Sequence, residues 1–258
     1  MEHWTDQGII LAARAHGENG AVASVLTRDH GRHNGYVYGA KSSKMRGNLE
    51  AGTWIEIEWT SRVSDQLGQF KFEQGKNSAA RMMHDPLKLA ALLSACALCD
   101  SALPEREGHS AIYHGMMALI ETLQTSVWAQ SYIMWELAFL KELGFGLDLT
   151  RCVAGGDSRT LTYVSPKSGC AVSLKEGYPY REKLLVLPDF LKPEPVWNTM
   201  NYPGNETEDE SARDIIKGLT LTGYFLQHWV FAHHSQGVPK ARERLGSMAV
   251  KQFTTAAA

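Results

Sequence analysis

The hydrophobic pattern of this 258-residue chain changes at Asp85-Pro86, and this change constrains the fold more than any other feature. Before it, five short apolar runs are separated by turns that contain glycine. In residues 54–59 apolar side chains alternate with two glutamates, which is the period of a half-buried strand. Five such strands predict a small closed barrel, because closure removes exposed sheet edges.

After this point the pattern becomes helical. Asp85 is a good N-cap and Pro86 suits the first helical position, so a helix is expected to begin there. Residues rich in glycine, serine and threonine, 148–177, favour a loop or hairpin. Helices are expected over residues 86–99, 109–125, 126–143 and 211–234. The sequence therefore predicts an α+β multidomain protein: a barrel domain over 1–80 and a helical domain over 81–258, interrupted by an insertion over 148–182.

Positive charge is concentrated in one part of the chain. With 26 basic and 28 acidic residues, the net charge of −2 excludes a surface that is cationic all over. Between Arg28 and Arg46, however, five Lys and Arg residues accompany a single acid, Asp29. Three of these cations lie in a glycine-bounded segment, residues 39–47, which we expect to be a loop. Fixed positive charges suit a phosphate backbone, because binding releases condensed counterions. A merely solvated loop is the alternative interpretation.

The cysteines lack the arrangement of a zinc site. The C-x2-C pair at residues 96–99 falls within an apolar predicted helix, where thiols behave as small hydrophobic groups. Cys152 and Cys170 each lack a second thiol three residues later, because Gly155 and Ser173 stand there. Since a zinc ribbon needs two complete knuckles, we expect no bound metal.

No motif for catalysis or for a cofactor is apparent. Lys41-Ser42 resembles the end of a nucleotide-binding loop, but Ala40 stands where that loop requires glycine. No run approaches the length of a membrane span, and the polar, acidic N-terminus lacks the features of a signal peptide. We therefore expect a cytoplasmic protein without catalytic activity, cofactor or membrane partner.

Four segments resemble the RecO family of bacterial DNA repair proteins, and the resemblance extends over nearly the whole chain. These segments are residues 4–11 with Gly17-Glu18, residues 39–44, residues 135–149, and residues 163–169 followed by 221–226. The first is typical of the family's opening strand. The second is similar to its cationic barrel loop, and the third to its helix-to-loop segment.

The resemblance implies an N-terminal OB-fold barrel, a helical domain and, in many relatives, a zinc ribbon inserted where residues 152–173 lie. Here that ribbon is degenerate, because its knuckles are halved. It also implies binding of single- and double-stranded DNA, annealing of complementary strands, and help for RecA in replacing single-strand-binding protein (SSB) on gapped DNA. The implied partners are RecR, RecA, often RecF, and the acidic tail of SSB, and the implied location is the nucleoid. Some relatives hold that tail with an arginine just before residue 135, whereas this chain has Ile133 and Met134.

The candidate DNA contacts are cations of the predicted barrel. We expect phosphates to be bound by Arg28, Arg32, Lys41, Lys44, Arg46, Arg62 and Lys71. Tyr36 and Tyr38 on the third predicted strand either stack on bases or belong to the core. The rival interpretation is a protein-interaction scaffold, in which the helical domain docks a peptide and the barrel charge is incidental.

Overall fold

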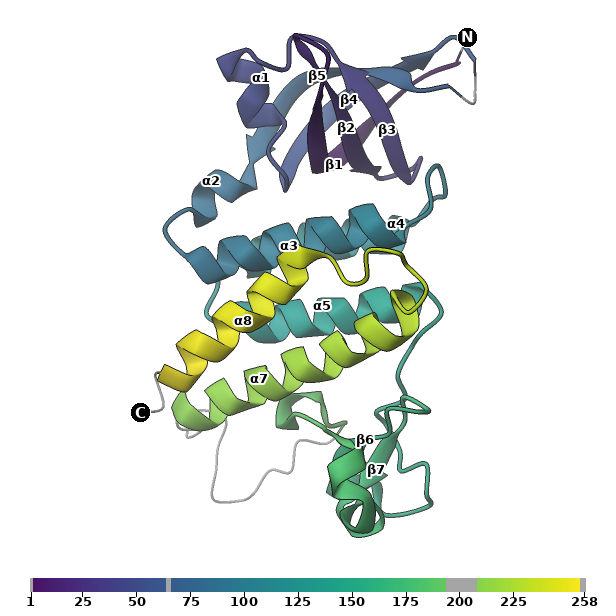
Figure 1. The fold of residues 1–258 in the computed structure, drawn as a ribbon, viewed down its shortest axis with the longest axis vertical. Coiled ribbons are helices and arrows are strands. Elements are labelled where there is room, and N and C mark those ends of the chain that lie inside the picture. Colours follow the sequence, from purple (N-terminus) through teal and green to yellow (C-terminus); the bar gives the residue numbers. More distant parts are fainter. Residues whose placement is uncertain (1, 64–65, 194–207, 256–258) are drawn as a thin grey trace. The chain divides into compact units, whose positions relative to one another are not determined.

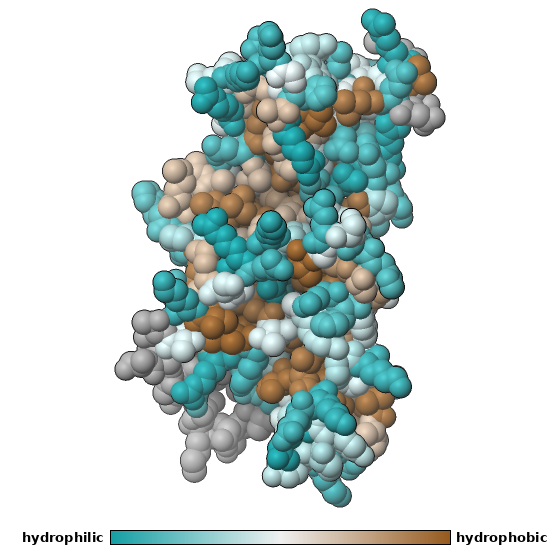
Figure 2. Space-filling view, viewed as in Figure 1, coloured by the Kyte–Doolittle hydropathy of each residue, from teal (hydrophilic) through white to brown (hydrophobic). Residues whose placement is uncertain are grey.

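The computed structural model describes residues 2–63, 66–193 and 208–255. The chain divides into two compact units, Met1–Trp128 with Pro239–Leu245, and Ala129–Val238 with Gly246–Ala258. The domain limits expected from the sequence stay a prediction. None of the described helices is long and apolar enough to span a membrane. On the face drawn in Figure 2, hydrophilic residues are interspersed with apolar patches.

The first unit contains a closed five-stranded barrel of OB-like topology, as predicted (Figure 1). Its strands are β1 (Glu2–His16), β2 (Gly20–Thr27), β3 (Arg32–Val37), β4 (Thr53–Ser61) and β5 (Gly68–Asn77). They follow one another around the barrel in the order β1-β2-β3-β5-β4. β3 and β5 pair in parallel, whereas the other named pairs are antiparallel.

The barrel core comes from the alternation seen in the sequence. Ile55, Ile57 and Trp59 of β4 are at most 2% exposed, while Glu56 between them is exposed. They pack with residues of the other strands in one cluster, which also includes Ile10, Ala23, Val25, Val37 and Phe70. The half-buried strand predicted here is therefore confirmed.

The cationic segment differs from the loop that the sequence predicts, because half of it is helical. Helix α1 (Ser43–Asn48) follows a turn in which Gly39 has φ of +66°. Ser42 caps this helix, since its Oγ accepts a hydrogen bond from the Met45 amide at 3.3 Å. Met45 and Leu49 pack against the barrel core, and this tertiary contact stabilises a helix too short to form alone.

Three further helices of the first unit follow the barrel. They are α2 (Ser78–Met82), α3 (Pro86–Ala102) and α4 (Ser110–Thr122). The Asp85 carboxylate accepts hydrogen bonds from the amides of Leu87 and Lys88, each at 3.2 Å, so the predicted N-cap is confirmed. Barrel and α3 are joined by an ion pair of 2.7 Å between Arg14 and Asp100.

The second unit combines helices with a small sheet. Its elements include α5 (Trp128–Glu142), β6 (Leu161–Val164), β7 (Ala171–Ser173), α6 (Leu174–Gly177), β8 (Leu185–Val186) and α7 (Glu208–Phe225). β6 lies between β7 and β8 and pairs antiparallel with both, so of the loop or hairpin expected over 148–177, β6 and β7 form the hairpin. Short helical turns lie at Ser158–Thr160, Tyr178–Lys183, Asp189–Leu191 and Leu226–Val230. The sequence did not predict the last helix, α8 (Lys240–Thr255), which contributes to both units.

In the sequence, apolar residues at spacings of three and four form one stripe on the helix expected over residues 126–143: Trp128, Tyr132, Trp135, Phe139 and Leu143. Helix α5 is buried on more than this stripe. Tyr132 and Phe139 of that stripe are buried, but Ile133 and Leu140 outside it are also 0% exposed. Buried Glu136 links α5 to α7, because it accepts hydrogen bonds from the hydroxyls of Tyr132 and Thr222. Ile133 and Leu140 are therefore core and not available to a peptide, whereas Leu137 is half-buried and Met134 is exposed.

Candidate nucleic-acid interface

Two cations of the segment of residues 39–47 are exposed to solvent. Lys41 and Arg46 are exposed, and Arg46 Nε donates to the Lys41 carbonyl oxygen at 3.2 Å, which orients the guanidinium along the segment. Lys44 belongs to α1, but its side chain lies outside the described part of the structure. Arg62 at the end of β4 is also exposed. No carboxylate of the described residues forms an ion pair with Lys41, Arg46 or Arg62.

Two tyrosines lie beside this segment on the outside of the barrel. Val37 between them is 1% exposed and belongs to the core, so Tyr36 and Tyr38 both point outward. Their rings meet edge to face at 4.6 Å between centroids. Tyr36 is half-buried against Gly20, where a Cβ would collide with its ring, whereas Tyr38 is 64% exposed. Tyr38 therefore offers a ring that a base can reach.

Three of the predicted cations have partners within the chain. Arg32 Nε donates to the Leu103 carbonyl oxygen at 2.9 Å, and its guanidinium lies 3.8 Å from Asp100. Lys71 Nζ lies 3.2 Å from Glu58, and this pairing lowers the pKa of that carboxyl. Arg28 donates to Asp29 through Nε and Nη2, at 3.0 and 2.8 Å. These pairs reduce the charge that the three cations offer to a phosphate, most completely for Arg32.

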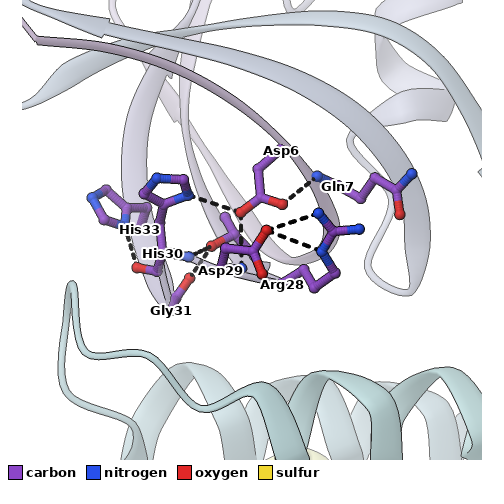
Figure 3. Close-up of polar contacts among 8 residues, drawn as sticks. Asp6, Gln7, Arg28, Asp29, His30, Gly31 and His33 are labelled. Atoms are coloured by element: carbon purple, nitrogen blue, oxygen red, sulfur yellow. Dashed lines mark hydrogen bonds and ion pairs between the residues drawn. The ribbon is translucent and has the colours of Figure 1, made fainter.

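The turn that carries Arg28 is fixed by a buried carboxylate that sequence reasoning missed (Figure 3). Asp6 Oδ2 accepts hydrogen bonds from the Asp29 amide and from His30 Nδ1, both at 2.9 Å, and Oδ1 accepts from the Gln7 amide at 2.7 Å. The Asp6 side chain is 0% exposed. These contacts join β1 to the turn between β2 and β3 and hold the backbone next to Arg28 against β1.

An acidic cavity lies on the outer face of the barrel next to this turn. It encloses about 410 Å³ and is lined by three glutamates of β4 and β5, Glu56, Glu58 and Glu73, together with Asp6 and Arg28. Lys71 pairs with one of these glutamates. A phosphate backbone would be repelled by these carboxylates, so this face of the barrel suits DNA less well than the face that carries Lys41 and Arg46.

The residues around Cys152 and Cys170 do not fit the zinc ion of a ribbon. Cys152 Sγ accepts a hydrogen bond from the Ser173 amide at 3.2 Å, and its thiol donates to Ser173 Oγ at 3.5 Å. Cys170 Sγ donates instead to the Ser168 carbonyl oxygen. Among the described residues, no three His, Cys, Asp or Glu side chains could hold a metal ion together, whereas structural zinc takes four ligands. The zinc-ribbon likeness of this insertion stays a prediction.

Comparisons with known proteins identify the family of this chain. The family described as Recombination protein O N terminal matches residues 1–78, and Recombination protein O C terminal matches residues 83–229. DNA repair protein RecO of Rhodospirillum centenum is 46% identical over 254 residues, which cover 98% of this chain and 96% of that protein. Proteins of the same name from Rhodospirillum rubrum and Hyphomonas neptunium are 39% and 41% identical, over 95% and 94% of this chain and 95% and 96% of their own lengths. This chain therefore belongs to the RecO family of DNA repair proteins.

Proposed function

We propose that this protein is a non-catalytic recombination mediator that binds single- and double-stranded DNA and anneals complementary strands. With RecR and RecF it would assist RecA loading on SSB-coated DNA. Membership of a DNA repair family supports the repair role. The contact with DNA itself rests on the barrel surface, where cations and an aromatic ring are exposed together.

The observation that carries this proposal is the position of Lys41 and Arg46 beside Tyr38. Both cations are exposed, and the tyrosine ring is 64% exposed on the same end of β3. Proteins that bind single strands combine a cationic track for the phosphates with aromatic rings for the bases. We assign the main phosphate contacts to Lys41, Lys44, Arg46 and Arg62, with a smaller share for Arg28, Arg32 and Lys71 because they are paired within the chain.

Annealing follows from the kind of contact proposed. Cations that neutralise two phosphate backbones lower the repulsion between strands. Stacking on a tyrosine occupies the face of a base and leaves its pairing edge free. Two strands held this way can test complementarity without help from a catalytic group.

We also propose that the helical part, residues 81–150 with 183–250, binds the tail of SSB. Such a tail offers acidic residues and an apolar end, and both suit a groove between helices with a cationic rim. Met134 stands where some relatives have arginine, and it is 58% exposed. Lys141 is exposed at the end of α5 and is a candidate for the rim. Titration with a fluorescent tail peptide tests this, since deletion of its apolar end and added salt should each weaken binding.

A salt-dependent DNA binding assay tests the central proposal. The full chain should bind labelled single strands and duplexes at low salt, release them as salt rises, and accelerate the annealing of complementary strands. The rival interpretation, a scaffold with incidental barrel charge, predicts peptide binding without DNA binding. If micromolar protein binds neither form of DNA at low salt, the DNA proposal is wrong.

A further inference from the structure

A second cavity of the first unit has the opposite character to the acidic one. It encloses about 590 Å³, within the size range of small-ligand clefts. It is lined by Gln7 of β1, Arg28 just after β2, the cross-strand pair formed by Trp54 of β4 and Lys76 of β5, helix α2, and one face of α4. The residues from α4 are Tyr113, His114, Met117, Ile120 and Glu121.

The floor of this cavity is apolar and aromatic. Tyr113 and Ile120 are buried, and Trp54 and Met117 are half-buried. The indole is held in place, because Trp54 Nε1 donates to the Tyr113 hydroxyl at 3.2 Å. Lys76 Nζ lies over the same indole at 5.5 Å from the ring centroid, which places a positive charge beside an aromatic surface.

The rim carries positive charge and polar groups. Lys76 and Arg81 are exposed, and no described carboxylate forms an ion pair with either of them. Arg28 also lines the cavity, while Glu121 is the one carboxylate among its lining residues. The side chains of Gln7 and His114 add hydrogen-bonding groups, whereas Ser78, which also lines the cavity, is 2% exposed. A ligand with a flat ring and an attached anionic group fits this cavity, because the ring can lie on the apolar floor while the anionic group reaches the cations of the rim.

The two cavities share Gln7 and Arg28, so Arg28 stands at the border between an acidic and a basic surface. A polyanion is attracted on the α4 side of this border and repelled on the other. The β5 residues that line the basic cavity also lie next to the cationic segment 39–47. Asn77, between Lys76 and Ser78, donates from Nδ2 to the Gly47 carbonyl oxygen at 3.3 Å.

We propose that this cavity receives one unpaired nucleotide of a bound DNA strand. The base lies against Trp54 and Met117, and the phosphate lies between Lys76 and Arg81. This inference rests on the proposed DNA binding and adds to it a site that only an unpaired base can enter. An acidic peptide would satisfy the cations, but the fixed indole and the polar groups of the rim favour a base.

Photo-crosslinking to the full chain tests the position of the base. A single strand that carries 5-iodouracil should cross-link to Trp54 or to residues 113–117, since aromatic, histidine and methionine side chains react with the excited base. Peptide mapping identifies the attached residue. Cross-links only outside the cavity, for example at Tyr38, would overturn this inference and leave the proposed DNA binding intact. No DNA binding at all would remove both.

Two variants sharpen the test. The double variant Lys76→Ala, Arg81→Ala should reduce the salt slope of single-strand binding by about 0.7 for each phosphate that the variant no longer binds.

His114→Trp fills the cavity from an exposed position, so it should weaken single-strand binding about tenfold but leave duplex binding unchanged. Lys167→Ala, an exposed cation of the second unit, is the matched control and should behave as the unchanged protein. Equal weakening of single-strand and duplex binding in His114→Trp would contradict the proposal. So would a cavity variant that no longer binds an acidic peptide but retains the single strand.

Discussion

Trp54 of β4 donates a hydrogen bond from its indole nitrogen to the hydroxyl of Tyr113 in α4, across 3.2 Å. This contact joins the barrel to α4 of the same unit and fixes the indole at the basic cavity. Tyr113→Phe removes the acceptor and should lower the free energy of unfolding by about 1 kcal/mol. Urea unfolding of this variant, of Trp54→Phe and of the double variant measures the coupling. If the two single effects simply add, the hydrogen bond contributes nothing.

Burial of His33 predicts a stability that depends on pH. Its ring lies against Trp59, and burial lowers the pKa of His33 to about 4. The charges of Arg106 and His30 also lower this pKa. The hydrogen bond to the His30 carbonyl oxygen and the charge of Glu105 raise it, but by less. Because the pKa of His33 is lower in the folded protein than its ordinary value of 6.5, the unfolded protein binds more protons at acid pH. The stability that comes from neutral, buried His33 is therefore complete above pH 6.5. It diminishes as the pH falls toward 4, by up to about 1.4 kcal/mol per pH unit.

The variant His33→Gln isolates this contribution, since glutamine does not titrate and can still donate to the His30 carbonyl. Unfolding free energies measured from pH 7 to pH 4 should fall less steeply in the variant than in the unchanged protein. Parallel curves would show that His33 does not titrate differently in the folded and unfolded states.

The cysteines should differ in reactivity. Burial raises the pKa of Cys96 to about 12 and that of Cys99 well above its ordinary value. Burial also acts to raise the pKa of Cys152, but hydrogen bonds from Ser173 and two neighbouring amides outweigh it, so this pKa is lowered. Because the thiolate is the nucleophile, iodoacetamide should modify Cys152 in the native protein and the other two only after unfolding. Mass spectrometry of the native protein decides this, and modification of Cys96 as fast as Cys152 would contradict it.

The incomplete knuckles predict that the purified protein holds no stoichiometric zinc. The second positions are Gly155 and Ser173, and Ser173 instead hydrogen-bonds the remaining thiol of Cys152. Elemental analysis of protein prepared without chelator should give well under one zinc per chain. One tightly held equivalent that disappears in Cys152→Ser would contradict this account.

Local signals in the sequence predicted most of the barrel and the start of α3. The alternation through Ile55, Ile57 and Trp59 and the cap at Asp85 depend on neighbouring residues, so the sequence displays them directly. Helix α1 was missed because contacts with the barrel, rather than helical periodicity, stabilise it.

The candidate site was only partly predictable for the same reason. The sequence shows that Lys71 is basic, but its pairing with Glu58 depends on the register of β4 and β5. The basic cavity joins Trp54, Lys76 and Tyr113, which are distant in the sequence and meet only in the fold. The helical spacing of the α4 residues was visible, but nothing local indicated which surface they would face.

The salt dependence of single-strand binding tests the central claim most directly. In the triple variant Lys41→Glu, Lys44→Glu, Arg46→Glu, binding should weaken strongly, and the slope of log affinity against log salt should fall by about 0.7 for each phosphate that is no longer bound. Lys167→Glu serves as the control, since Lys167 is an exposed cation of the second unit, and it should leave the slope unchanged. A triple variant with the affinity and slope of the unchanged protein would contradict the account, because the DNA would then lie on another surface.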